Sequence, residues 1–190
     1  MAPLSDAELK TQQRGVVLAA GLALVVCALV LTAAYVCLPG LFEFPQDLPE
    51  RMAFAVRAEV FVFLWVLFGV RQVSDGRFRS AADNRGSAYG SPSRSLAIPV
   101  AFLQNTLEQA VIAAGAHLAL STLVSGNALS LIVGAVVLFG IGRVCFLLGY
   151  ARGARGRAFG MVLTVVPTLA AYGLAVYLIG SAVIGQFLAL

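Results

Sequence analysis

The sequence is poor in charged residues. Only 12% of its residues are Asp, Glu, Lys or Arg, whereas 60% are hydrophobic, and the mean hydropathy is +0.91. Soluble globular domains carry about twice that share of charge, ~25%. This composition excludes an ordinary soluble domain and predicts an integral membrane protein.

Residues that cross-link small folds or bind metals are also scarce. The chain has three cysteines, Cys27, Cys37 and Cys145, and a single histidine, His117. Three cysteines without paired spacing form neither a disulfide framework nor a zinc motif. We interpret them as small apolar residues. His117 has no second histidine or carboxylate near it in the sequence, which favours a packing role and predicts no metal site.

Long apolar runs are abundant. Five of them are long enough to cross a bilayer, which requires about 20 helical residues. The sequence therefore predicts an all-α membrane protein with five transmembrane helices, at residues 16–38, 54–70, 96–124, 128–150 and 159–188. The first run is too long for a typical secretory signal, so we interpret it as a retained anchor.

The basic residues predict the orientation. In a five-span arrangement Lys10, Arg14 and the arginines after the second and fourth spans lie on one side, and the other side has only Arg51. The positive-inside rule then places the N-terminus in the cytoplasm and the C-terminus outside. The net charge of +4 reflects this topology and contact with membrane lipid, and it does not indicate nucleic-acid binding. The bias toward Ala and Arg favours a bacterial cell (inner) membrane.

Residues 71–95 connect the second and third spans. This segment is rich in Gly, Ser and Arg, a composition that cannot bury a core. We expect a flexible basic loop on the cytoplasmic side.

Deep polar side chains concentrate in the third and fourth spans, which a short turn at residues 125–127 makes antiparallel. Glu108 lies 18 residues before Gly126, and Arg143 lies 17 residues after it. The two side chains should therefore lie at one depth, where a charge is costly unless it is paired or hydrated. We expect Glu108 and Arg143 to meet in a polar cleft. The alternative is a hydrogen-bonded network that only fixes helix packing.

The second span contains a further deep carboxylate, Glu59. Its neighbour Arg57 can extend to the headgroups. Residues two apart do not share a helix face, so Arg57 and Glu59 should not pair. We expect Glu59 to face another helix or a hydrated cavity, and the sequence does not identify its partner.

An ordered set of short motifs runs through the last four spans. NTLEQ at 105–109 is followed by GR at 142–143, GY at 149–150, AR at 151–152 and a further arginine, Arg157. In this order and spacing the motifs resemble the MAPEG family, membrane-associated proteins in eicosanoid and glutathione metabolism, over about residues 54–188. The extra first span is similar to mattrin, a divergent five-span branch. The resemblance divides the chain into residues 1–50, with the tail, the extra helix and an outer loop, and a four-helix membrane domain at 51–190.

The resemblance implies a homotrimer that binds glutathione as co-substrate between subunits, near the cytoplasmic side. Arg157 would stabilise the glutathione thiolate, with Tyr150 beside it as the second catalytic residue. The implied binding residues are Asn105, Glu108, Gln109, Arg143 and Arg71. The reaction would be conjugation of a lipophilic electrophile or reduction of a lipid peroxide.

Two positions depart from the family pattern. Ala101 stands where catalytic members generally carry Arg, and Phe146 replaces a Tyr that is common in the leukotriene-synthesising branch. Each change removes a hydrogen-bond donor that would contact glutathione. A non-catalytic trimeric membrane protein that keeps the fold is therefore an alternative. A small transporter is a third hypothesis, but no internal repeat or pair of broken helices supports it.

Overall fold

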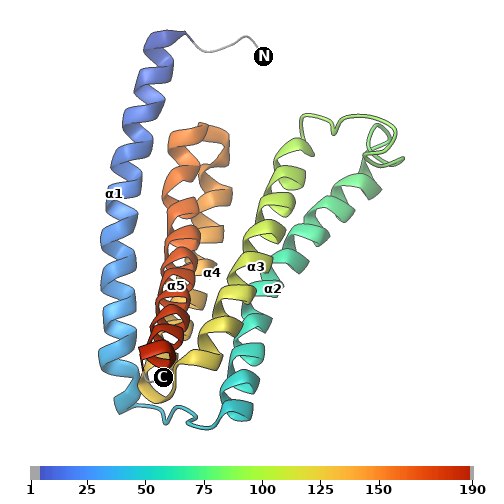
Figure 1. The fold of residues 1–190 in the computed structure, drawn as a ribbon. Coiled ribbons are helices and arrows are strands. Elements are labelled where there is room, and N and C mark those ends of the chain that lie inside the picture. The colour runs from blue at the N-terminus through green and yellow to red at the C-terminus, as the bar shows by residue number, and fades with distance from the viewer. Residues whose placement is uncertain (1–4, 189–190) are drawn as a thin grey trace.

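The computed structural model describes residues 5–188, and the regular structure of this part is entirely helical. Five long helices run alternately up and down, side by side (Figure 1). The all-α prediction is confirmed. The elements are α1 (Asp6–Cys37), η1 (Leu38–Gly40), α2 (Leu48–Arg79), α3 (Ala97–Leu123), η2 (Gly126–Leu129), α4 (Ser130–Gly149), η3 (Tyr150–Arg152) and α5 (Ala154–Leu188).

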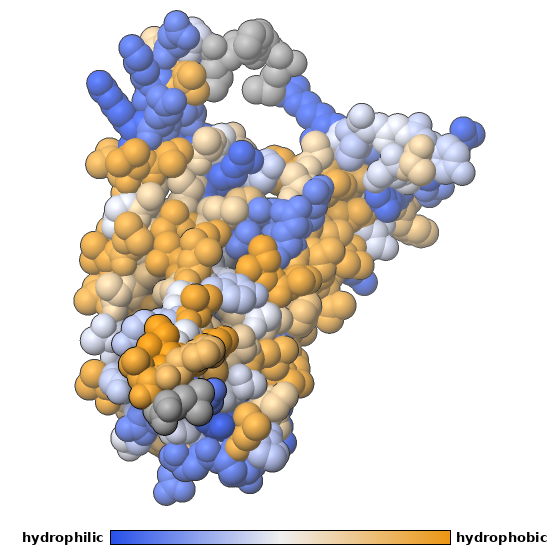
Figure 2. Space-filling view, in the orientation of Figure 1, coloured by the Kyte–Doolittle hydropathy of each residue, from blue (hydrophilic) through white to orange (hydrophobic). Residues whose placement is uncertain are grey.

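Four of the long helices, α1, α2, α4 and α5, have the length and apolar composition to cross a membrane. Helix α3 carries a run of polar side chains at residues 104–109 within its apolar sequence. Its C-terminal end is tied to the start of α2, where Arg51 donates to the carbonyl of Val124 at 2.8 Å. Its 27 residues are about 40 Å long, so α3 also spans the bundle. Figure 2 shows a broad hydrophobic band with hydrophilic residues at both ends, as an integral membrane protein requires.

Helices α1 and α2 extend furthest beyond the predicted spans. Helix α1 begins at Asp6 because Ser5 and Glu8 form a reciprocal capping box. Helix α2 continues to Arg79, so the prediction that residues 71–79 belong to a loop was wrong. The apolar run ends at Val70, but the helix continues past it. On this part of α2, Arg71 pairs with Asp75 at 2.8 Å, one helical turn away.

Helix α5 is the centre of the bundle. It packs against α4, α1 and α3, while α2 packs mainly on α3. Contact between α4 and α5 is close because glycines meet at it. A Cβ on Gly160 would collide with the backbone of Gly142 and Phe146, and a Cβ on Gly149 would collide with the backbone of Gly156. Small residues let the two helix backbones approach each other in this way.

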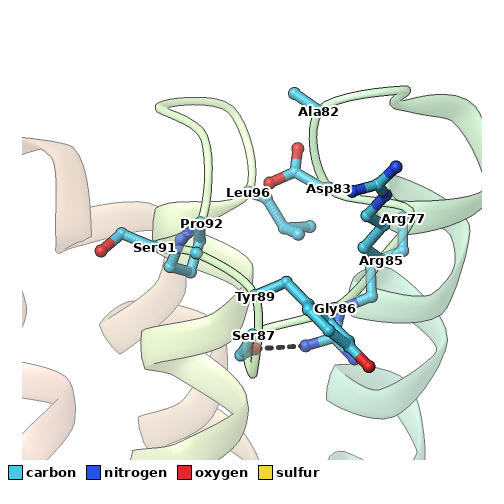
Figure 3. Close-up of a pocket in the computed structure, with 11 residues that line it drawn as sticks. Arg77, Ala82, Asp83, Arg85, Gly86, Ser87, Tyr89, Ser91, Pro92 and Leu96 are labelled. Atoms are coloured by element: carbon cyan, nitrogen blue, oxygen red, sulfur yellow. Dashed lines mark hydrogen bonds between the residues drawn. The ribbon is translucent and has the colours of Figure 1, made fainter.

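Residues 80–96, between α2 and α3, form a chain of hydrogen-bonded turns. The carboxylate of Asp83 accepts from the Ser80 hydroxyl at 2.6 Å and from the Ser93 N–H at 2.7 Å. The turns enclose a pocket of about 180 Å³, in which Arg77 donates to the hydroxyl of Ser87 (Figure 3). The segment thus has a defined arrangement. Its flexibility stays a prediction.

Candidate functional site

Arg143 is the centre of a polar cluster inside the bundle. Its side chain extends from α4 and is fully buried. Nη1 donates to Oδ1 of Asn105 on α3 at 2.9 Å, and Nη2 donates to Oγ1 of Thr164 on α5 at 2.6 Å. The guanidinium thus joins three helices. A buried guanidinium is costly inside a membrane bundle unless oxygen acceptors of this kind bind its N–H groups.

Aromatic rings line the Arg143 guanidinium as well. Its central carbon lies 4.8 Å from the ring centre of Phe146 and 5.4 Å from that of Phe139. Such cation–π contacts strengthen when water is excluded. Phe146, which departs from the family pattern, therefore supports Arg143 by its ring face.

Glu108 does not meet Arg143, and this prediction was wrong. The Glu108 side chain is exposed on the surface of the single chain and accepts a hydrogen bond from Gln104 at 3.2 Å. No ion pair joins it to Arg143 in the part of the chain that the structure describes. Residue spacing gives the depth of a side chain but not the direction in which it points. Glu108 lies about 60° around α3 from Asn105. This takes it from the edge of the buried face, where Asn105 is half-buried, onto the exposed surface.

Tyr150, directly after α4, and Arg157, in the first turn of α5, contact each other beside the Arg143 cluster. The Arg157 guanidinium carbon lies 4.9 Å from the ring centre of Tyr150, and this ring lies 5.5 Å from that of Phe146. Because Phe146 also contacts Arg143, a continuous series of contacts connects the two arginines. Both predicted catalytic residues thus belong to the same cluster as Asn105.

The remaining predicted site residues lie outside this cluster. Arg71 is exposed on α2, where it pairs with Asp75. Gln109 is half-buried on α3. Ala101, also half-buried, lies one turn before Asn105 on the same helix.

Thr164, the second hydrogen-bond partner of Arg143, was not predicted from the sequence. Its hydroxyl inside a mainly apolar span was the available signal, and Thr168 in the same span gives the same signal without contacting Arg143. Thr164 Oγ1 also donates back to the carbonyl of Met161 at 2.8 Å, which leaves its lone pairs available to the guanidinium.

A second buried polar pair lies nearer the end of the bundle where α2 begins and α3 ends. Nδ1 of His117 on α3 is 2.5 Å from Oε1 of Glu59 on α2, and the two residues are only 1% and 5% exposed. This contact identifies the partner that the sequence left open for Glu59. The expectation that Glu59 faces another helix is confirmed. His117 is part of a specific interhelical pair, so the interpretation as a simple packing residue was incomplete.

An apolar cleft of about 640 Å³ lies between α2 and α4. Phe61 and Trp65 line it from α2, and Val137 and Gly140 line it from α4. Arg57 is the charged residue of this lining, near the end where α2 begins. Gly140 lies about one turn before Arg143 on α4, so the cleft and the polar cluster are neighbours along this helix.

Comparison with known proteins identifies the family. The model of the MAPEG family matches residues 52–177, which is more than half of the chain. The chain belongs to the MAPEG family. A search of curated proteins and a search of solved structures give no match.

The MAPEG match begins in the first turns of α2 and ends within α5. It therefore includes the polar cluster around Arg143, the Tyr150–Arg157 contact and the Glu59–His117 pair. Helix α1 lies wholly before the matched residues. The family assignment from the short motifs is confirmed.

Proposed function

We propose that this MAPEG protein binds glutathione between neighbouring subunits of a homotrimer and presents the thiolate to a lipophilic electrophile. The observation that carries the proposal is the Arg143 cluster. A buried guanidinium fixes Asn105, and aromatic contacts connect it to Tyr150 and Arg157. These are residues that the family resemblance assigns to glutathione.

The trimer is supported by the position of Glu108. This carboxylate is exposed on α3, about 17 Å along the helix from Ala97. A charge that faces lipid at such depth costs roughly 2.5–3.5 kcal/mol or more. A neighbouring subunit with a polar ligand between the two surfaces removes this cost. The amino group of glutathione is the complement that a carboxylate requires.

Arg157 and Tyr150 supply the chemistry in this proposal. A thiolate is a far better nucleophile than a thiol, and a fixed cation beside it lowers the thiol pKa. The Arg157 guanidinium stabilises the sulfur anion, while the Tyr150 ring holds the guanidinium in place. The thiolate then forms a thioether, either by adding to an activated double bond or by displacing a leaving group from the electrophile. Alternatively it attacks a lipid peroxide, which releases the lipid alcohol and leaves a sulfenic acid on the glutathione sulfur; a second glutathione converts this to the disulfide and water.

The second substrate is a lipophilic molecule in the α2–α4 cleft. Its apolar walls suit an acyl or aromatic group, and Arg57 suits an acidic end group. We orient the arginine-rich end of the bundle toward the cytoplasm, where glutathione is available.

Thermal unfolding in detergent tests the binding. Reduced glutathione at millimolar concentration should raise the Tm of the wild type by mass action. The shift should decrease in Asn105→Ala and Glu108→Gln. The matched control is Thr122→Ala, an exposed position near the far end of α3. The proposal is wrong if the wild type and all variants show no shift.

A second candidate function is a non-catalytic membrane protein that uses the same residues for packing. The burial of Arg143 favours it, because both Nη groups already have protein acceptors. Removing one acceptor, as in Thr164→Val, should then cost about 1.5–3 kcal/mol without any ligand. The same substitution should have little effect in an Arg143→Met background. Turnover of an electrophile by the wild type would exclude this candidate.

A further inference from the structure

The N-terminal helix α1 contacts the first turn of α5, where Arg157 lies. The side-chain oxygen Oε1 of Gln12 accepts a hydrogen bond from the backbone N–H of Arg155 at 3.0 Å. The two residues are 143 positions apart in the sequence. This contact therefore comes from the packing of α1 against the bundle and is not a local turn.

Helix α5 requires such a contact because it lacks a side-chain cap of its own. Ala154 begins the helix, and the residue before it is Gly153, whose φ is +77°. Glycine permits this left-handed conformation but has no side chain to accept from the first N–H groups. The Gln12 amide oxygen supplies the acceptor that a Ser, Thr, Asp or Asn cap normally provides.

A second contact shows how closely α1 fits this turn. Gly15 lies one turn after Gln12 on α1, directly against the side chain of Arg155. A Cβ added to Gly15 would lie 2.8 Å from Cβ and 3.2 Å from Cδ of Arg155. The absence of a side chain at position 15 thus allows α1 to come within hydrogen-bond distance of the α5 backbone.

The capped turn determines where Arg157 lies. The Arg157 N–H bonds to the carbonyl of Gly153 at 3.4 Å, so the residue is in the same turn. Its guanidinium is stacked on Tyr150. A turn that frays would release Arg157 from this ring and from the sulfur that it would stabilise.

We propose that Gln12 is a positioning residue: from the added helix α1 it caps α5 and thereby holds Arg157 in the glutathione site. Because α1 lies outside the matched residues 52–177, this cap comes from a part of the chain that the family domain does not include. The effect on glutathione rests on the function proposed above, whereas the cap itself does not.

Gln13 provides a matched control. It has the same side chain at the next position of α1 and is exposed, whereas Gln12 is half-buried. Gln12→Ala removes the acceptor, Gln12→Glu keeps an oxygen acceptor, and Gln13→Ala changes the same helix without touching α5. The carboxylate of Gln12→Glu also suits the positive end of the α5 dipole.

Amide hydrogen exchange of the full-length protein in detergent tests the cap without any ligand. In Gln12→Ala the amides of residues 154–157 should exchange about fivefold faster, the ratio expected for the loss of a typical cap. Gln12→Glu and Gln13→Ala should exchange like the wild type. Equal exchange in Gln12→Ala and the wild type would overturn the cap.

The ultraviolet absorbance of the thiolate tests the effect on the site. At saturating glutathione, Gln12→Ala should lower the thiolate absorbance, and Gln12→Glu should restore it. Unchanged thiolate absorbance and affinity in Gln12→Ala would overturn the positioning role. If the wild type binds no glutathione, the proposed function and this role both fail, and the exchange experiment alone decides whether the cap exists.

Discussion

At the scale of single residues, two buried polar groups hold the bundle together at different depths. Arg143 joins α4 to α3 and α5 through Asn105 and Thr164. His117 joins α3 to α2 through Glu59. Both side chains are buried away from water, so each depends on its protein partner for its hydrogen bonds.

The Glu59–His117 pair should be strongly coupled. Removing one member leaves a buried polar or charged group without its partner, which costs about 3–5 kcal/mol. Glu59→Leu and His117→Leu should each destabilise the protein by that amount, whereas the double variant should lose much less than the sum. Unfolding in detergent for the four proteins of this double-mutant cycle measures the coupling. Additive losses would show that the two side chains act independently.

The limits of sequence-based prediction are clear at this scale. Depth follows from residue spacing, so the level of Arg143 within the bundle could be predicted. The partner depends on the rotation of each helix about its axis, and this rotation is set by packing along its whole length. For that reason Glu108 was expected beside Arg143 together with Asn105, whereas Asn105 and Thr164 are there and Glu108 is not.

At the scale of elements, the contact between α4 and α5 depends on glycine. Gly160 of α5 lies against the backbone of α4, which cannot move aside as a flexible side chain can. Gly160→Ala should therefore force the helices apart and cost about 1–3 kcal/mol, the usual effect of overpacking. Tm in detergent measures it.

The matched control for Gly160 is Gly173, on the same helix. A Cβ at Gly173 would have no atom within 4 Å. Gly173→Ala should be neutral or stabilise the helix by up to about 1 kcal/mol, because alanine has the higher helix propensity. Equal destabilisation by both substitutions would show that glycine at position 160 has no special role in packing.

The turns between α2 and α3 should depend on pH through Asp83. Hydrogen bonds from the Ser80 hydroxyl and the Ser93 N–H hold the pKa of this carboxyl below its ordinary value of 3.8. A lowered pKa in the folded state means that the stabilisation is complete above the ordinary value. It is lost as the pH falls through the lowered one. Amide protection at residues 83–93 should therefore be constant from neutral pH to about pH 4 and decrease below it.

Asp83→Asn removes this ionisation and provides the comparison. Its protection should be several-fold weaker at neutral pH and should no longer depend on pH in the acid range. Asp75→Asn, which changes only an exposed pair with Arg71, should behave like the wild type. A loop that exchanges freely at every pH in the wild type would confirm the flexibility that its composition predicts and contradict the role of Asp83.

The boundaries of elements were less predictable than their existence. Five apolar runs were sufficient to predict five helices. Helix α1 begins ten residues earlier and α2 ends nine residues later than the apolar pattern indicates. Hydropathy reports where lipid ends, whereas a helix ends where its backbone finds a cap or a turn.

At the scale of the whole molecule, a hydrophobic band with hydrophilic residues at both ends fits a bundle that crosses a membrane (Figure 2). Glu108 is a charged side chain exposed within the third span. For a single chain in lipid, Glu108→Leu should be stabilising, because it removes the cost of a lipid-facing charge. For the proposed trimer it should be destabilising, because it places an apolar side chain in a polar contact between subunits.

Because a single chain and a trimer predict opposite changes in stability, Glu108→Leu tests whether the protein assembles. We expect native mass spectrometry to find three copies of the wild type, and Glu108→Leu to shift the protein toward single chains. Glu108→Gln keeps the size and a hydrogen-bonding oxygen but not the charge, and it should lie between the two. If Glu108→Leu instead raises Tm and leaves the number of copies unchanged, Glu108 faces lipid. The glutathione site then cannot lie between subunits at this residue.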